Sequence, residues 1–180
     1  DELQELFTLL NDFKILCVIK KGIFGSLYIN SFFESMWKAN IYSSKHNTLF
    51  DGAPILITRN SNKKGLFNGN QGICLRVGKQ QYFVLPRGGR FLFYPLAFLP
   101  TFELAYAMTI HKSQGSEYSD ILVVLPEEEK HTLLTREILY TGITRAKKSA
   151  FVYANKTVLE KTIHTSIERE TGIQIWQNFT

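Results

Sequence analysis

The stretch DILVVL at residues 120–125 is a continuous run of apolar residues after its first aspartate. Two similar runs, FKILCVI at 13–19 and AFVYA at 150–154, lie before and after it in the chain. Unbroken apolar runs are typical of parallel strands that are covered on both faces. Segments of helical length alternate with them, at 27–39, 133–148 and 157–169. The sequence therefore predicts an α/β domain, with a parallel sheet and flanking helices.

The middle of the chain has a different pattern. Short β-branched and aromatic runs are separated there by turns such as Asn68-Gly69 and Gly88-Gly89, and they lie at 54–60, 72–77, 81–86 and 90–99. This pattern is typical of a small antiparallel barrel or sandwich. We therefore predict a discontinuous α/β domain formed by residues 1–50 and 101–180, with a β module inserted at residues 51–100.

The net charge of +5 is unevenly distributed. Between Asp51 and Glu103 there are seven basic residues and no acidic one: Arg59, Lys63, Lys64, Arg76, Lys79, Arg87 and Arg90. A solvated surface normally mixes both signs, so this interval is typical of a surface that binds a polyanion. The alternative is a basic region without a partner.

The composition and the start of the chain exclude several classes of protein. With 180 residues, 44% of them hydrophobic, and two cysteines, the chain is neither a disordered tail nor a disulfide scaffold. No apolar run approaches the roughly 20 residues that a membrane span requires. The chain begins Asp1-Glu2, without a basic signal-peptide start. We expect a cytosolic protein piece that begins in mid-chain, with Cys17 and Cys74 as buried free thiols.

A nucleotide-binding P-loop is missing from the sequence. The nearest approach to G-x-x-x-x-G-K-[ST] begins at Gly72, has one residue too many between its glycines and carries Gln80 where the hydroxyl should be. There is also no dinucleotide fingerprint and no nucleophile elbow. The three glutamates at 127–129 before His131 indicate a solvated loop, so no metal site is predicted.

Two segments could carry chemistry. In AYAMTIHKSQGSE at 105–117, Thr109 could cap a short helix that ends near Gly115, and its free N–H groups could hold a phosphate. In TREILYTGITRAKK at 135–148, Arg145 lies near the end of a predicted helix and could reach a triphosphate held by another domain. Each segment also has an alternative without a ligand. In the first, Thr109 only caps the helix and His111 is an ordinary surface residue. In the second, the basic residues only complement the C-terminus of the helix.

These segments carry a family resemblance. MTIHKSQGSEY at 108–118 resembles motif V of superfamily 1 helicases of the RecD type, and REILYTGITRA at 136–146 resembles their motif VI. Two further parts of the chain are similar to stretches of this family. One is KKGIFG at 20–25, followed by Asn30, and the other is GAPILITRN at 52–60 with GLFNGNQG at 65–72. The four matches occur in the family's order. Asn70 stands where the family usually has Asp, Ile23 where it usually has Pro, and Gly142 where Ala is common.

The resemblance implies a RecA-like second motor domain with an inserted SH3-like β-barrel, the C-terminal part of an ATP-dependent 5′-to-3′ DNA helicase. ATP and Mg²⁺ would be bound mainly by a missing N-terminal RecA-like domain, which would supply the P-loop. Arg145 would be the arginine finger, and the nucleotide site would include Gly115 and Glu117. Single-stranded DNA would contact motif V and the insertion, through Thr109, His111, Lys112, Ser113, Gln114, Arg59, Lys63, Lys64 and Asn68.

Within this family, the chain is most similar to the alpha chains of exodeoxyribonuclease V. The likeness lies in the sequence GLFNG, in Ser113 and in the tail ERETG at 168–172. The resemblance implies a bacterial cytoplasmic helicase-nuclease of double-strand break repair and recombination. Its beta and gamma chains, together with single-stranded and duplex DNA, would then be partners, with no membrane. Two alternatives are a stand-alone helicase of the same type, and a DNA-binding or subunit-docking module without its own ATPase.

Overall fold

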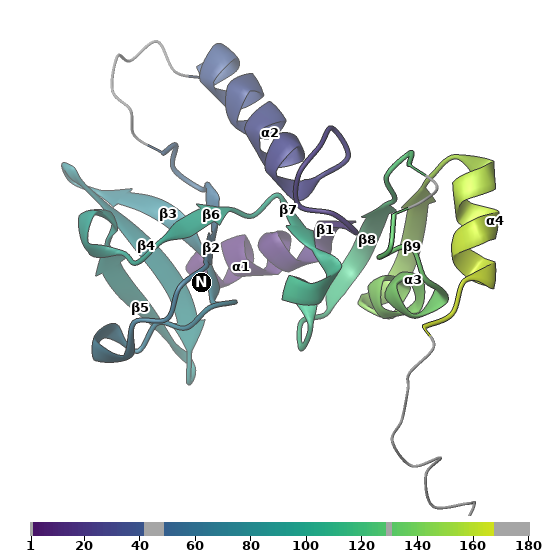
Figure 1. Cartoon of the computed structure of the whole chain (residues 1–180). Coiled ribbons are helices and arrows are strands. Elements are labelled where there is room, and N and C mark those ends of the chain that lie inside the picture. Colours follow the sequence, from purple (N-terminus) through teal and green to yellow (C-terminus); the bar gives the residue numbers. More distant parts are fainter. Residues whose placement is uncertain (1, 42–48, 129–130, 168–180) are drawn as a thin grey trace, which may run out of the picture.

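The computed structural model describes residues 2–41, 49–128 and 131–167, which form two sheets (Figure 1). The first sheet is parallel and has the order β7-β1-β8-β9. Its strands are β1 (Phe13–Cys17), β7 (Ala107–Thr109), β8 (Tyr118–Val124) and β9 (Ala146–Tyr153). The predicted α/β fold with a parallel sheet is therefore confirmed.

Helices cover both faces of the central strands. The run at 150–154 was predicted to be covered in the same way, but β9 lies at the edge of the sheet, with Phe151 57% and Tyr153 55% exposed. On one face, α2 (Ser26–Ile41) contributes Ile29 and Phe33, which pack with Cys17 of the central strand. On the other face lie α3 (Arg136–Ile143) and α4 (Lys156–His164), which meet Leu16 in the larger core (Figure 1). Because successive strand residues point to opposite faces, the uninterrupted apolar run of β1 supplies both cores.

The second sheet is the predicted antiparallel module. It has the order β5-β4-β3-β2-β6, with strands β2 (Pro54–Ile57), β3 (Gln71–Val77), β4 (Gln80–Arg87), β5 (Arg90–Pro95) and β6 (Phe102–Leu104). Its core includes Ile55, Leu66 and Phe83. Gly72 allows β3 and β4 to approach closely, since a Cβ there would lie 2.1 Å from the Val84 carbonyl oxygen. We call this sheet and its loops, residues 52–104, the insertion.

The N-terminal helix α1 (Glu2–Asp12) was not predicted from the sequence. It joins the two sheets, because it leads directly into β1 while its buried Phe7 packs with Ile73 and Val84 of the insertion. The ring of Phe7 also stacks on that of Phe91, with 5.4 Å between the centroids. The hydrophobic contact of α1 is therefore with the insertion rather than with the parallel sheet alone.

Several predicted elements end earlier than expected, among them the strand runs at 13–19 and 54–60, which end at Cys17 and Ile57. The helix predicted at 133–148 covers only α3, because the chain from Ala146 onward pairs with β8 instead. The strand predicted at 90–99 stops at Pro95, where a 3-10 turn, η2 (Leu96–Phe98), follows. The helix predicted at 157–169 ends at His164, and residues 168–172 lie outside the described residues.

Both cysteines are free and buried, as predicted. Burial raises the pKa of the Cys17 thiol to about 12 and that of Cys74 to about 11, so both are protonated at neutral pH. Within the described ranges, no helix has the length and apolar character to cross a membrane.

Candidate nucleotide and nucleic-acid site

The segment that follows β7 forms a short 3-10 turn, η3 (Ile110–Ser113). Thr109 occupies the position before this turn, but its side chain makes no capping hydrogen bond, so the predicted cap is wrong. Gly115 has φ +81°, a conformation that favours glycine, and a Cβ at this position would meet open space. The chain therefore reverses at Gly115 before it enters β8.

The polar side chains of this turn lie in different environments. His111 and Gln114 are exposed and Thr109 is half-buried. Ser113 is fully buried, and its Oγ donates a hydrogen bond to the Ile110 carbonyl oxygen at 2.7 Å. In this conformation Ser113 stabilises the turn and cannot reach a phosphate, so the prediction that it contacts DNA does not fit its position.

A groove lies between this turn and α3. It has a volume of about 390 Å³ and is lined by His111 and Gln114 on one side and by Thr135, Glu137 and Thr141 on the other. Thr135 begins α3, because its Oγ1 accepts a hydrogen bond from the Ile138 N–H at 3.3 Å. The two segments singled out in the sequence therefore face each other across this groove.

Arg145 follows α3 and is half-buried. Its Nε donates a hydrogen bond to the Thr141 carbonyl oxygen at 3.1 Å, and one terminal nitrogen donates to Thr144 Oγ1 at 3.4 Å. In the part of the chain that the structure describes, no carboxylate forms an ion pair with Arg145. Its guanidinium is therefore held by neutral acceptors and is available to an anion.

The segments around Glu117 and Arg145 are joined through the backbone. The Tyr118 N–H donates to the Arg145 carbonyl oxygen at 2.9 Å, and Tyr118 pairs with Ala146 in the parallel register. Next to this pair, Glu117 forms an exposed ion pair with Lys147, with 3.4 Å between the charged atoms. A movement of the Glu117 segment at the start of β8 must therefore also move the start of β9, which follows Arg145.

Glu103 holds two lysines at the point where the insertion returns to the parallel sheet. Its carboxylate accepts a hydrogen bond from Lys112 of η3 and forms an ion pair with Lys20 at 3.1 Å. Burial alone would raise the pKa of Glu103, but the hydrogen bonds from Lys112 and Lys20 outweigh this effect and hold the pKa below its usual value. Lys112, predicted as a DNA contact, is therefore already neutralised by a carboxylate.

The insertion presents its predicted DNA contacts on the surface. The side chains of Arg59, Lys63, Lys64 and Asn68 are all exposed. The backbone N–H of Asn68 donates to the side-chain oxygen of Asn60 at 2.7 Å. The side-chain oxygen of Asn70 accepts a hydrogen bond from the Phe67 N–H at 2.8 Å, which an Asp carboxylate could also accept. The replacement of the family's usual Asp by Asn70 therefore leaves this turn intact.

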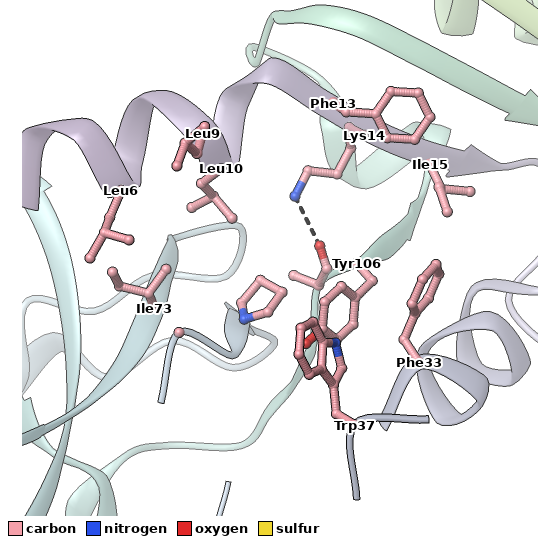
Figure 2. A pocket seen from close by; sticks show the side chains of 13 residues that line it. Leu6, Leu9, Leu10, Phe13, Lys14, Ile15, Phe33, Trp37, Ile73 and Tyr106 are labelled. Carbon is pink, nitrogen blue, oxygen red and sulfur yellow. Dashed lines mark hydrogen bonds between the residues drawn. The ribbon is translucent and has the colours of Figure 1, made fainter. Parts of the chain in front are cut away.

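A second cavity separates the insertion from the parallel sheet (Figure 2). It has a volume of about 470 Å³, and its lining is mainly apolar, including Leu10, Phe33 and Trp37. Two polar groups also contribute to it. Lys14 Nζ donates to the Ala105 carbonyl oxygen at 2.9 Å, drawn as a dashed line in Figure 2, while the buried hydroxyl of Tyr106 has no hydrogen-bond partner among the described residues.

Sequence reasoning missed Glu103 and Lys14, and it identified Lys20 only as part of the KKGIFG stretch. Glu103 could have been noticed, because it is the first acidic residue after the long acid-free interval. Lys14 could also have been noticed as a single charge inside an apolar strand, where a solvated side chain is not expected. The partners of all three depend on long-range contacts that spacing does not reveal.

Comparison with known proteins identifies relatives over most of the chain. Residues 104–153 match the family described as UvrD-like helicase C-terminal domain. The chain is 34% identical over 168 residues to RecBCD enzyme subunit RecD of Buchnera aphidicola subsp. Schizaphis graminum, which covers 89% of this chain and 28% of that protein. It is 39% identical over 122 residues to the RecD subunit of Haemophilus influenzae, covering 68% of this chain and 18% of that protein.

The fold has a relative among solved structures. The Pif1 helicase from Bacteroides, in complex with ADP-AlF3 and ssDNA, aligns with 96% of this chain and 49% of its own, with a TM-score of 0.56 and 17% sequence identity. At this identity the likeness supports the fold alone. This chain spans less than a third of the RecD subunits named above.

Proposed function

Because this chain matches the C-terminal part of the RecD subunit along most of its length, we propose that it is the second motor domain of an ATP-dependent 5′-to-3′ DNA helicase. The specific helicase that we propose is the alpha chain of exodeoxyribonuclease V, whose beta and gamma chains would be its partners in the bacterial cytoplasm. The five-stranded insertion would correspond to the SH3-like barrel of this family.

The observation that carries this proposal is the direct connection between the two motifs. A helicase must couple nucleotide hydrolysis to its grip on DNA, which requires that the two sites share a structural element. Here the turn with His111 and Gln114 leads within a few residues to Tyr118, whose N–H is bonded to the Arg145 carbonyl oxygen. The DNA-facing turn and the nucleotide-facing arginine are therefore linked by one hydrogen bond and one strand pair.

In this proposal each partner of the reaction has a defined position. Arg145 contacts the γ-phosphate of an ATP that is bound with Mg²⁺ by the N-terminal motor domain, and Glu117 lies near the ribose with Gly115 between the two sites. DNA phosphates contact Thr109, His111 and Gln114 and the cations of the insertion. Lys112 joins them only when a phosphate displaces Glu103 from it, and Ser113 supports the turn from inside.

The experiment is Arg145→Ala in the longer protein that contains both motor domains. An arginine finger contributes roughly 10³ to 10⁵ in rate, because its planar guanidinium stabilises charge on the transferring phosphoryl group. We expect a loss of DNA-stimulated ATPase activity of this size, with affinity for single-stranded DNA nearly unchanged. Steady-state ATP hydrolysis and fluorescence anisotropy of a labelled oligonucleotide measure the two quantities.

Arg136→Ala is the matched control. Arg136 lies at the start of the same helix, is exposed and forms only a weak pair with Glu137 at 3.9 Å. Its removal should leave both ATPase activity and DNA affinity unchanged. An ATPase loss of less than about tenfold in Arg145→Ala would exclude the finger role. A two-domain protein that hydrolyses no ATP even before the substitution would favour a DNA-binding or docking module instead.

A further inference from the structure

Two phenylalanines on the insertion stay exposed although their loops are firmly anchored. Leu66 is fully buried in the insertion core, while its neighbour Phe67 is 45% exposed. In η2, Leu96 packs against the same core, while Phe98 is 63% exposed. Since burying an aromatic ring is favourable, rings that are held outward by buried neighbours are available to a partner.

Each of these rings has a cation beside it. Lys64 Nζ lies 5.9 Å from the centroid of the Phe98 ring and also donates to the Phe98 carbonyl oxygen. The guanidinium carbon of Arg87 lies 5.9 Å from the centroid of the Phe67 ring. Gly65 connects the two pairs, because a Cβ at this position would come within 3.1 Å of Arg87 Nη1. We call Phe98, Lys64, Arg87 and Phe67 the aromatic strip.

The charge of the aromatic strip is not compensated. Among the residues that the structure describes, no carboxylate pairs with Lys64 or Arg87, and residues 52–102 contain no acidic side chain. By contrast, Arg76 on the same insertion pairs with Asp51 at 3.6 Å. A partner of the strip must therefore supply negative charge together with flat apolar groups that can lie on the rings.

We propose that the aromatic strip binds single-stranded DNA through its bases, which stack on Phe67 and Phe98 while Lys64 and Arg87 contact the phosphates. This inference rests on the proposed function and adds base contacts to the phosphate contacts described above. Duplex DNA does not fit as well, because its bases are stacked on one another and their faces are closed. Aromatic platforms with interleaved cations bind single strands with little sequence preference.

The test compares two strands with the same number of phosphates. One is an oligothymidylate of about 16 nucleotides, and the other has the same length but only abasic sites. The 180-residue chain should bind the oligothymidylate about 25-fold more tightly than the abasic strand at the same salt concentration, because stacking on each of the two rings contributes about five-fold or more. Fluorescence anisotropy measures both affinities.

Phe67→Ala and Phe98→Ala test the two rings separately. Each should weaken binding of the oligothymidylate about five-fold and leave binding of the abasic strand unchanged. Lys64→Met should weaken binding of both strands equally and lower the salt slope by about 0.7 log units per decade. Phe93→Ala is the control, because Phe93 is also 45% exposed but packs edge-on against Tyr82, and it should change neither affinity. Thermal melts verify that each variant is folded.

Three results would overturn the proposal. If the unaltered chain binds both strands equally, with the usual dependence on salt, base stacking is wrong while DNA binding by the insertion stands. The same conclusion follows if the phenylalanine variants lose affinity for both strands alike, as a ring that only supports the fold would do. If neither strand binds, the DNA contact of the proposed function fails as well.

Discussion

At the scale of single residues, Lys14 has the most unusual environment in the molecule. Among the residues that the structure describes, it is the only charged residue that is buried, with 2% of its surface exposed. Its ammonium group meets the Ala105 carbonyl oxygen and lies 5.4 Å from the centroid of the Tyr118 ring. Burial without a carboxylate partner lowers the pKa of Lys14 to about 8.

Because of this pKa shift, the contribution of Lys14 to the free energy of unfolding depends on pH. The pKa is about 8 in the folded chain and 10.5 in the unfolded chain, so the unfolded chain binds more protons between these values. The free energy of unfolding contributed by Lys14 therefore rises as the pH rises from 8 to 10.5. Lys14→Met removes the buried charge. Its stability relative to the unaltered chain should fall by roughly 3 kcal/mol across this range.

Urea unfolding of both proteins at several pH values measures this difference. Lys21→Met is the control for the loss of a lysine charge, because Lys21 is exposed on the turn after β1. A stability difference between Lys14→Met and the unaltered chain that stays constant from pH 7.5 to 10.5 would show that Lys14 is not desolvated in solution.

Glu103 should respond to pH in the opposite direction. Its folded pKa lies below the usual value of 4.5, so its contribution to stability is present above that value and is lost as the pH falls through the folded pKa. We expect Glu103→Gln to lower the free energy of unfolding by about 1 to 3 kcal/mol at pH 7, because two lysines lose a charged acceptor. At pH values below the folded pKa the two proteins should be equally stable.

The matched control for Glu103 is Glu34→Gln. Glu34 also pairs with a lysine, Lys38, at 2.7 Å, but both lie one turn apart on the surface of α2. Such pairs contribute only about 0.3 to 0.5 kcal/mol. Chemical unfolding at pH 7 should therefore separate the two variants clearly, and equal losses would contradict the role given to Glu103.

At the scale of elements, the connection from β6 to β7 is held mainly by one side chain of α2. The amide nitrogen of Asn30 donates to the carbonyl oxygens of Leu104 at 2.7 Å and Ala107 at 2.9 Å, and its oxygen accepts from the Ala107 N–H at 2.8 Å. One buried amide thus satisfies three backbone groups where the insertion ends and the parallel sheet resumes.

Asn30→Leu should loosen this connection. It removes three hydrogen bonds and leaves buried backbone groups without partners, so we expect a loss of about 3 kcal/mol or more in the free energy of unfolding. Hydrogen–deuterium exchange should show early exchange of the Ala107 amide. Ser31→Ala is the control: Ser31 is exposed and its hydroxyl donates only within α2, so little change is expected. Unchanged protection of the Ala107 amide in Asn30→Leu would show that Asn30 does not hold this connection.

The sequence pattern predicted the buried strands well and their ends less well. Runs such as 13–19 and 120–125 identify central strands, because a strand covered on both faces carries mainly apolar residues. The β7 strand, by contrast, has three residues and owes its pairing to β1, far away in sequence. The helix predicted to reach residue 148 ends at Ile143, because pairing with β8 outweighs local helix propensity.

The candidate site was predictable where the chemistry is local. His111, Gln114 and Arg145 were found from their motifs, and the structure brings their segments together. The burial of Ser113 and the pairing of Lys112 with Glu103 were not predictable, because both depend on how η3 packs against distant elements. The roles of these residues in binding stay predictions.

At the scale of the whole molecule, the charge is divided between the two sheets. Within the insertion, residues 52–102 carry seven basic residues and no acidic one, and the rest of the chain, which includes Glu103, has 14 basic against 16 acidic residues. Binding of single-stranded DNA by the 180-residue chain should therefore weaken with salt, by about 0.7 log units per decade for each phosphate neutralised. The chain alone should not hydrolyse ATP, since its sequence has no P-loop.

Reversal of charge locates this binding. Lys63→Glu with Lys64→Glu should abolish measurable binding at moderate salt, because two cations are replaced by anions that repel phosphate. Lys156→Glu with Lys161→Glu makes the same change in net charge on α4, away from the insertion, and should weaken binding far less. Equal losses in both double variants would mean that net charge, rather than the insertion, determines binding.

The place of the insertion in the chain also sets an order for folding. Ile15 of β1 pairs with Ala107 of β7, and the whole insertion lies between them in sequence. A growing chain on the ribosome therefore exposes β1 long before its partner exists. The strand pairs within the hairpins β3–β4 and β4–β5 join residues that are close in sequence, so these hairpins can form first. A folded insertion brings residues 54 and 105 together and so shortens the loop that closes the parallel sheet.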